Sequence, residues 1–164
     1  MAESSQALAA GATSINIGII NTSKAIDAMN AKLSTVDVKT KTAELTKLVD
    51  ADKKLKANLE TMQTALTAQK NSATDEQLKA TLTQQIEMNK QTIALLEQNI
   101  SANEQSIELL KSVGTARTTV ASIKEGLDGK GTKEESGLKV GANSLDKNLT
   151  ALAKGLDAMN TKSD

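Results

Sequence analysis

The strongest constraint on the fold is the spacing of apolar residues, which alternates between steps of three and four along most of the chain. This alternation places the side chains along one side of an α-helix and is typical of coiled coils. The spacing therefore predicts long helices rather than strands. The first row, with Thr22 in its single gap, comprises Leu8, Ala12, Ile15, Ile19, Ile26, Met29, Leu33 and Val36.

Three further rows follow the first. The second comprises Leu45, Leu48, Asp52, Leu55, Leu59, Met62 and Leu66. The third comprises Leu82, Ile86, Asn89, Ile93, Leu96, Ile100, Asn103, Ile107 and Leu110, then shifts by one residue to Leu109, Val113, Ala116, Val120, Ile123 and Leu127. The fourth comprises Leu138, Ala142, Leu145, Leu149, Leu152, Leu156 and Met159. We interpret Asn89 and Asn103 as register-setting residues, because a buried Asn in a coiled coil costs stability but penalises other registers.

The composition favours slender helical contacts over a thick core. The 164 residues include no Phe, Tyr, Trp or Pro. Aromatic side chains bury the largest areas in globular cores, so a chain without them is better suited to narrow helix–helix contacts. Without proline, no pyrrolidine ring forces a helix to end. The composition therefore predicts an all-α fold.

Chain reversals are predicted at two segments. In residues 71–77, Thr74 and Gln77 have the spacing of a capping box that begins a helix. Residues 126–137 hold four of the nine glycines, and Thr132 with Glu135 has the same capping spacing. Over residues 34–42 the apolar spacing slips without Gly or Pro, so we expect a register shift in a continuous helix there in preference to a turn.

The rows predict an arrangement as well as helices. A hairpin at residues 71–74 makes the numbers of facing residues sum to roughly 146. The slip near residue 37 then lies opposite residue 109, where the third row also shifts. We therefore expect one elongated helical domain over residues 1–164: an antiparallel two-helix coiled-coil arm, 40–109, on a three-helix base. The base comprises residues 4–36, 110–127 and 133–162, and a four-helix bundle is the alternative.

The two ends of the chain carry similar segments. Residues 11–30 and 141–160 are identical at eight of twenty aligned positions. Glycine inside a helix costs about 1 kcal/mol relative to alanine, so repeated glycines beside an apolar row indicate close packing. Either the two segments pack together in one bundle, or they also mediate self-association, for example as a homodimer. The small residues beside the rows are Gly11, Gly18, Ala25, Gly141 and Gly155.

The composition also excludes several classes of function. Without His or Cys, the usual zinc, haem and nucleophile–base sites are absent. We therefore expect no catalytic, metal or cofactor site, and no enzyme. The 20 basic and 20 acidic residues balance, which argues against nucleic-acid binding. No apolar run reaches the ~20 residues that span a bilayer. The expected partners are proteins.

Three stretches share a rhythm of Leu and Gly with Ala, Ser, Asn and Asp between them: "LAAGATSINIGI", "SIKEGLDG" and "GLKVGANSLDKNLTALAKGLDAMN". The rhythm resembles the ectodomain repeats of phage infection protein (Pip)-type membrane proteins of Gram-positive bacteria. These proteins in turn resemble the accessory membrane subunit of type VII secretion systems. The resemblance covers roughly residues 5–32 and 120–160, and residues 40–110 match only as coiled coil. The chain departs from the family in its few repeats and its lack of transmembrane helices.

The resemblance implies a fragment of a non-enzymatic ectodomain on the extracellular face of the cell membrane, whose parent protein has transmembrane segments. Such a fragment would act as stalk, spacer or receptor, with a bacteriophage protein among its partners. The tip around residues 71–74, or the outer face of the arm, would then bind the partner. The alternative is a cytoplasmic or phage coiled-coil assembly protein. A designed protein is disfavoured by the irregular rows and interior glycines.

Overall fold

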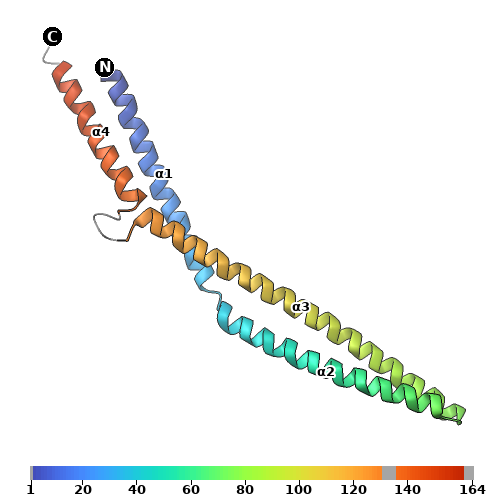
Figure 1. The fold of residues 1–164 in the computed structure, drawn as a ribbon. Helices are drawn as coiled ribbons and strands as arrows, with labels where there is room; N and C mark the ends of the chain where they lie inside the picture. The colour runs from blue at the N-terminus through green and yellow to red at the C-terminus, as the bar shows by residue number, and fades with distance from the viewer. Residues whose placement is uncertain (1, 131–135, 161–164) are drawn as a thin grey trace. The chain divides into compact units, whose positions relative to one another are not determined.

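The computed structural model describes residues 2–130 and 136–160, which form four helices (Figure 1). The all-α prediction is confirmed, since the described residues contain no strand beyond an isolated bridge between Gly129 and Ser136. The chain divides into two compact units: an arm of residues 37–114, and a base of residues 1–36 and 115–164. The helices are α1 (Ala2–Ser34), α2 (Val38–Ser72), α3 (Glu76–Asp128) and α4 (Leu138–Asn160).

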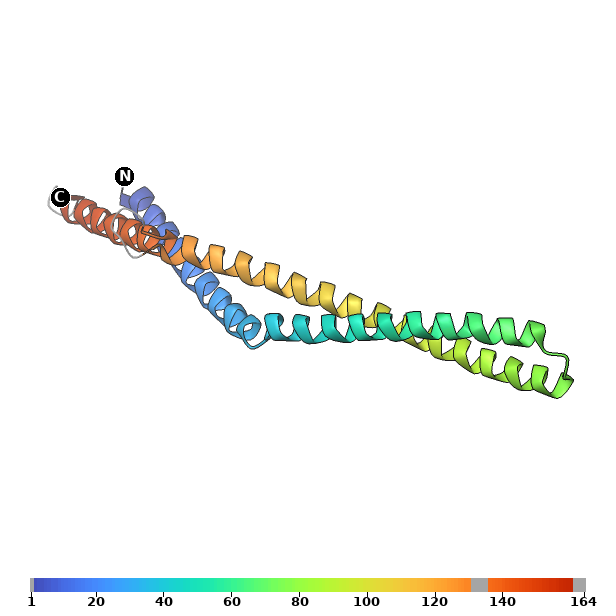
Figure 2. The same cartoon turned by 60° about the horizontal axis from the view of Figure 1, so that its bottom comes forward.

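In the arm, α2 and the first part of α3 run antiparallel beside each other (Figure 2). The 35 residues of α2 make this pair about 50 Å long at 1.5 Å per residue. On α3, the row from Leu82 to Leu110 faces α2, as the spacing predicted. Its best buried members are Leu82, Ile86, Leu96 and Ile100. The contact is thin, and none of the large side chains described falls below 2% exposure.

The link between α1 and α2 is a break in the helix at residues 35–37. The Asp37 side chain accepts a hydrogen bond from the backbone N–H of Thr40 at 3.0 Å, which caps the start of α2. Our expectation of a register shift inside a continuous helix is therefore wrong at this point. An aspartate that satisfies a free N–H allows a helix to restart without Gly or Pro.

The N-terminus of α3 lies one residue beyond the predicted start. Asp75 Oδ1 accepts hydrogen bonds from the N–H groups of Gln77 at 2.7 Å and Leu78 at 3.1 Å. Asp75 therefore caps α3 in the role that we predicted for Thr74. The second predicted capping box, Thr132 with Glu135, lies outside the described residues.

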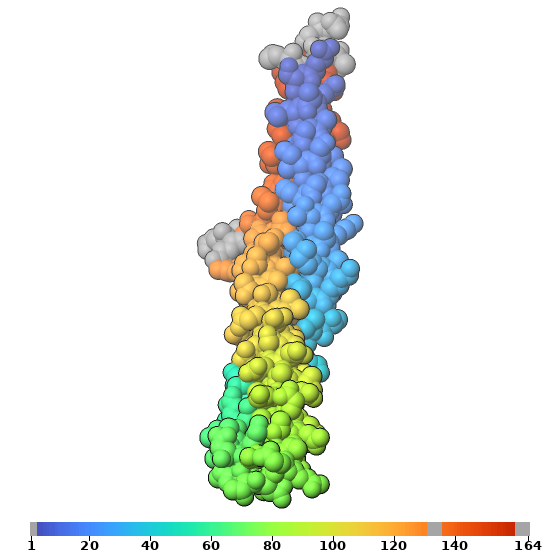
Figure 3. All heavy atoms as spheres, turned by 90° about the vertical axis from the view of Figure 1, so that its right-hand side faces the viewer, coloured from blue at the N-terminus to red at the C-terminus, as the bar shows by residue number. Residues whose placement is uncertain are grey.

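In the base, α1 is paired along its length with two segments in succession. Its C-terminal half contacts the end of α3, where Arg117 Nε donates to the Leu33 carbonyl at 2.9 Å. Its N-terminal half contacts α4, where Gln6 Nε2 donates to Asp157 at 2.9 Å. Both contacts are antiparallel, and atoms of α4 border those of α1 in Figure 3. The three predicted base segments are thus present, but they pack two at a time: α1 pairs with the end of α3 over its C-terminal half and with α4 over its N-terminal half.

Two glycines shape the connection from α3 to α4. Gly129 has φ of 76° and donates its N–H to the Glu125 carbonyl at 2.7 Å, as a left-handed glycine after a helix does. A Cβ on Gly137 would overlap backbone atoms of Leu127, Asp128 and Gly129. The glycine-rich segment is therefore used for a left-handed residue and for a close backbone approach.

Candidate functional site

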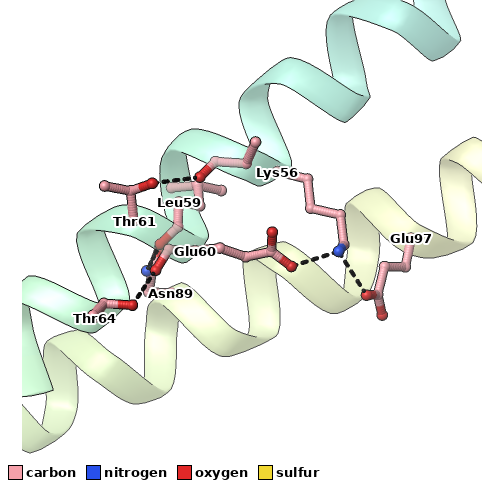
Figure 4. Close-up of polar contacts among 8 residues, drawn as sticks. Lys56, Leu59, Glu60, Thr61, Thr64, Asn89 and Glu97 are labelled. Carbon is pink, nitrogen blue, oxygen red and sulfur yellow. Dashed lines mark hydrogen bonds and ion pairs between the residues drawn. The ribbon is translucent and has the colours of Figure 1, made fainter.

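The arm contains a polar layer across its helix contact (Figure 4). Asn89, at 7% exposure, donates from Nδ2 to the Leu59 carbonyl of α2 at 2.7 Å. Farther along the same contact, Lys56 Nζ pairs with Glu60 at 2.5 Å and with Glu97 of α3 at 3.3 Å. Hydrogen bonds to Glu60 and then Glu97 raise the pKa of Lys56. These polar groups bind across the interface and tie α2 to α3.

Both predicted register-setting residues lie on the contact side of α3. Asn89 has a partner on the facing helix, as described above. Asn103 is half-buried in the same row, two heptads farther along. Their placement is what the register hypothesis requires, while their effect on the register stays a prediction.

The base contains a network of four charged residues that joins three helices. Lys124 of α3 pairs with Asp27 of α1 at 2.5 Å and with Asp128 at 2.8 Å. Asp128 also pairs with Lys139 of α4 at 2.9 Å. Hydrogen bonds to Asp128 and Asp27 raise the pKa of Lys124, and those from Lys124 and Lys139 lower the pKa of Asp128. The network is partly exposed, and exposed ion pairs add little to the free energy of unfolding. Its main effect is therefore to hold the ends of the three helices in alignment.

The sequence repeat corresponds to an approximate twofold axis in the base. Asn16 and Asp146 are equivalent positions of the repeat, and Asn16 Nδ2 donates to Asp146 Oδ2 at 3.2 Å. Ala12 and its equivalent Ala142, which lie on opposite sides of this pair along the helices, are both buried. Two equivalent residues that touch at the middle of an antiparallel helix pair define a twofold axis normal to the plane of the helices. Equivalent side chains of α1 and α4 therefore point to the same side of the pair.

The predicted rows of the base are only half correct. Ala12 and Ala142 face the neighbouring helix, but Ile15 is 56% exposed and Leu145 is 46% exposed. The contact instead uses the next residue along the chain, Asn16 or Asp146. The row of the arm helix α2 is displaced in the same manner, because Val49 is buried while Leu48 is exposed.

The displaced apolar residues form one surface, which we name the outer face of the base. All but Met159, which continues the row of α4, immediately precede a residue of the helix contact, so they lie about 80° around their helices from the contact centre, in the same rotational sense. Because α1 runs antiparallel to both α3 and α4, this sense brings the rows to one side of the base. The outer face comprises Leu8, Ile15, Met29, Ile123, Leu138, Leu145, Leu152 and Met159, with exposures from 44% to 68%.

The helix positions that border the outer face carry no charge from Ser4 to Ala28 of α1 and along α4, and the first charged residue beside the face on α1 is Lys32, just beyond Met29. On α1 they are Ser4, Ala7, Gly11, Ser14, Gly18, Asn21, Thr22, Ala25 and Ala28, all exposed. On α4 they are Gly141, Ser144, Asn148, Ala151, Gly155 and Ala158, also exposed. Charged residues make up 24% of the chain, so about a quarter of these positions would be charged if charges were evenly spread. The base therefore separates an uncharged side from a charged one.

The predicted packing glycines lie on this same side. The similar segments do pack together as α1 and α4, but the glycines are not between them. A Cβ built on Gly11, Gly18, Gly141 or Gly155 has no heavy atom within 4 Å. Ala25 is likewise exposed. Close packing through these residues is thus not made inside the described base, and the self-association hypothesis is the one that would use them.

Metal binding and membrane insertion would each need a recognisable group of residues. Residues 2–130 and 136–160 hold no group of three or more His, Cys, Asp or Glu side chains placed to bind a metal ion. No helix among them is both long and apolar enough to cross a bilayer. No known family model, curated protein or solved structure matches the chain. The outer face is therefore the candidate site that the geometry defines.

Proposed function

We propose that this chain is a non-enzymatic helical spacer that acts as a stalk at the cell surface and associates with protein through its base. The observation that carries the proposal is the outer face, a set of half-exposed aliphatic side chains whose borders on α1 and α4 are uncharged up to Lys32. Apolar surface of this kind marks protein–protein contact sites in proteins that otherwise keep such side chains scattered.

The arm supports the spacer role. An antiparallel pair about 50 Å long, tied by Asn89 to Leu59 and by Lys56 to Glu97, resists sliding of one helix past the other. Its grooves are lined by α2 and α3 alone, for example by Met62 and Met88 on opposite walls. Such an arm holds two ends of a protein apart rather than enclosing a small substrate.

The cell-surface location rests on the resemblance of residues 5–32 and 120–160 to Pip-type ectodomains. It can be tested with single cysteines, because the chain has none of its own. Ser72→Cys places a thiol at the exposed turn end of the arm, and Val49→Cys places one at a buried position as the matched control. On intact cells that produce the parent protein, a membrane-impermeant maleimide should label the Ser72→Cys variant and not the Val49→Cys variant. Labelling of the Ser72→Cys variant only after lysis would refute the location and favour the cytoplasmic assembly role.

A receptor role for bacteriophage is the finer form of this proposal. The soluble chain, added in excess, should then compete with cells for phage adsorption. Substitutions at Asn71 and Thr74 on the tip should weaken that competition, while the buried control Val49→Ala tests whether instability alone has the same effect. Unchanged adsorption at saturating chain concentration would refute the receptor role and leave the spacer role to the labelling test.

A further inference from the structure

We propose that a second copy of this chain docks on the outer face of the base, so that two bases form a symmetric four-helix contact. The inference rests on the proposed function in that it names the protein partner of the same surface. The arm is not needed for this contact, because its own exposed apolar row of Leu48, Leu55 and Met62 is bordered by charged residues such as Lys47 and Lys54.

The exposed area of the chain is the first argument. The chain exposes 11438 Å². A compact monomer of 17.2 kDa exposes about 7,800 Å², so this chain exposes about 3,600 Å² more. Stable homodimers bury roughly 2,000–5,000 Å² in total, about half of it from each copy. This excess belongs to the arm and the base together, and an interface of this size would cover only part of it.

The chemistry of the outer face is the second argument. A partner of opposite charge has nothing to bind there, since the positions on and beside the face are uncharged from Ser4 to Met29 on α1 and from Leu138 to Met159 on α4. A surface without charges is matched by another apolar surface. The outer face of a second copy satisfies this condition from Ser4 to Met29 of α1 and from Leu138 to Met159 of α4.

The approximate twofold axis is the third argument. Asn16 and Asp146 meet at its centre, and Leu8, Gly11 and Ile15 of α1 are equivalent to Leu138, Gly141 and Leu145 of α4, so the first half of each helix presents the same order of large and small side chains. Two such faces placed together bring the aliphatic rows to the middle of a four-helix arrangement. The flanking glycines then lie where the helices of the two copies approach, and no Cβ at Gly18 or Gly141 holds the backbones apart.

The first test measures the mass of the full chain in solution. Because the chain has no Trp or Tyr, its concentration cannot be followed by the usual ultraviolet absorbance, and light scattering with refractive-index detection is used instead. At about 100 μM, which detects even weak dimers, the mass should be twice 17.2 kDa, and the melting temperature should rise with concentration. A mass of 17.2 kDa together with a concentration-independent melting temperature would overturn the proposal.

Charge substitutions then locate the interface. Ile15→Glu and Leu145→Glu place a carboxylate at equivalent positions on the outer face, and each should weaken dimerisation at least ~100-fold, because the charge would be buried without a partner. Ile17→Glu is the matched control, since Ile17 is 53% exposed on the other side of the same helix. This control should remain dimeric. Equal dimerisation of the Ile15→Glu and Ile17→Glu variants would overturn the assignment of the face.

Cross-linking gives a second measurement that needs no destabilising substitution. Ile15→Cys and Ile17→Cys differ only in the side of α1 on which the sole thiol lies. A flexible bis-maleimide should give a covalent dimer of the Ile15→Cys variant in much higher yield than of the Ile17→Cys variant. Equal yields would refute docking on the outer face. The result is independent of cell-surface labelling of the Ser72→Cys variant. Absence of the dimer and absence of the chain from the cell surface are therefore distinguished by separate experiments.

Discussion

The substitution Asn89→Leu in the arm should separate stability from register. Asn89 is 7% exposed, and its Nδ2 donates to the Leu59 carbonyl at 2.7 Å. Loss of this hydrogen bond costs about 0.5–1.5 kcal/mol. The Leu59 carbonyl is not left without a donor, because inside an α-helix it also accepts from the N–H four residues later. Burial of a leucine side chain contributes about 1.5–3 kcal/mol in the opposite direction. The variant should therefore be about 1 kcal/mol more stable.

The same substitution should loosen the register of α2 against α3. An apolar residue fits other heptad registers as well as the native one, whereas a buried Asn without its carbonyl partner does not. A slip of one heptad moves the helices by about 10 Å. Lys53 and Glu104 have charged ends 2.7 Å apart across the contact. With Lys53→Cys and Glu104→Cys introduced together, such a slip would appear as a loss of cross-linking by a short dithiol reagent.

Urea unfolding followed by circular dichroism measures the stability of the two proteins, and hydrogen exchange assigns the change to the arm. Asn89→Ala is the control: it removes the hydrogen bond without adding apolar area and should lose about 1–2 kcal/mol. A less stable Asn89→Leu protein would refute the energetic reasoning. Full retention of the cross-link between positions 53 and 104 in that protein would refute the register role of Asn89.

Three further predictions concern the charge network, the connection and the caps. Hydrogen bonds from Lys124 and Lys139 lower the folded-state pKa of Asp128, so its contribution to stability is present above the unfolded pKa of about 4 and is lost as pH falls through the lower folded pKa. The melting temperature of the Asp128→Asn variant should therefore fall less steeply than that of the unsubstituted chain as the pH is lowered through this range. Gly137→Ala should destabilise by more than about 2 kcal/mol in urea unfolding, because its Cβ overlaps backbone, whereas Gly126→Ala, with open space at its Cβ, should stabilise by about 0.5–1 kcal/mol. Asp75→Ala should cost about 1 kcal/mol in the same assay and Thr74→Ala nearly nothing, and the reverse order would refute Asp75 as the cap.

The helices and the hairpin could be predicted from the sequence because they depend on local spacing. Steps of three and four specify a helix wherever they occur, and the polar segment at residues 71–77 specifies a reversal. The caps at Asp37 and Asp75 were missed although the signal was present, since aspartate is among the preferred N-cap residues. At Asp37 the preference for a continuous helix hid it, and at Asp75 the capping-box spacing of Thr74 competed with it.

The side of each helix that faces its neighbour could not be read from the rows alone. In α1, positions 12 and 19 belong to the contact whether it continues through Ile15 or through Asn16. Hydrophobicity favours Ile15, but Asn16 reaches Asp146 across the interface, and this partner is 130 residues away. The charge network of Lys124, Asp128 and Lys139 was invisible for the same reason. Such contacts depend on the alignment of helices that local spacing does not specify.

The error in the rows is itself informative. When a helix has apolar residues at two positions of each heptad, one neighbouring helix can cover them. A third apolar position widens the apolar side of the helix beyond what one neighbour covers. In the base, the third position is aliphatic at Ile15, Leu145 and Leu152, although the same helices place their lysines and aspartates elsewhere. A helix pair that functioned alone would gain solubility from charges at these positions. A contact that a single copy does not make would explain their aliphatic character, and the proposed docking of a second base would supply that contact.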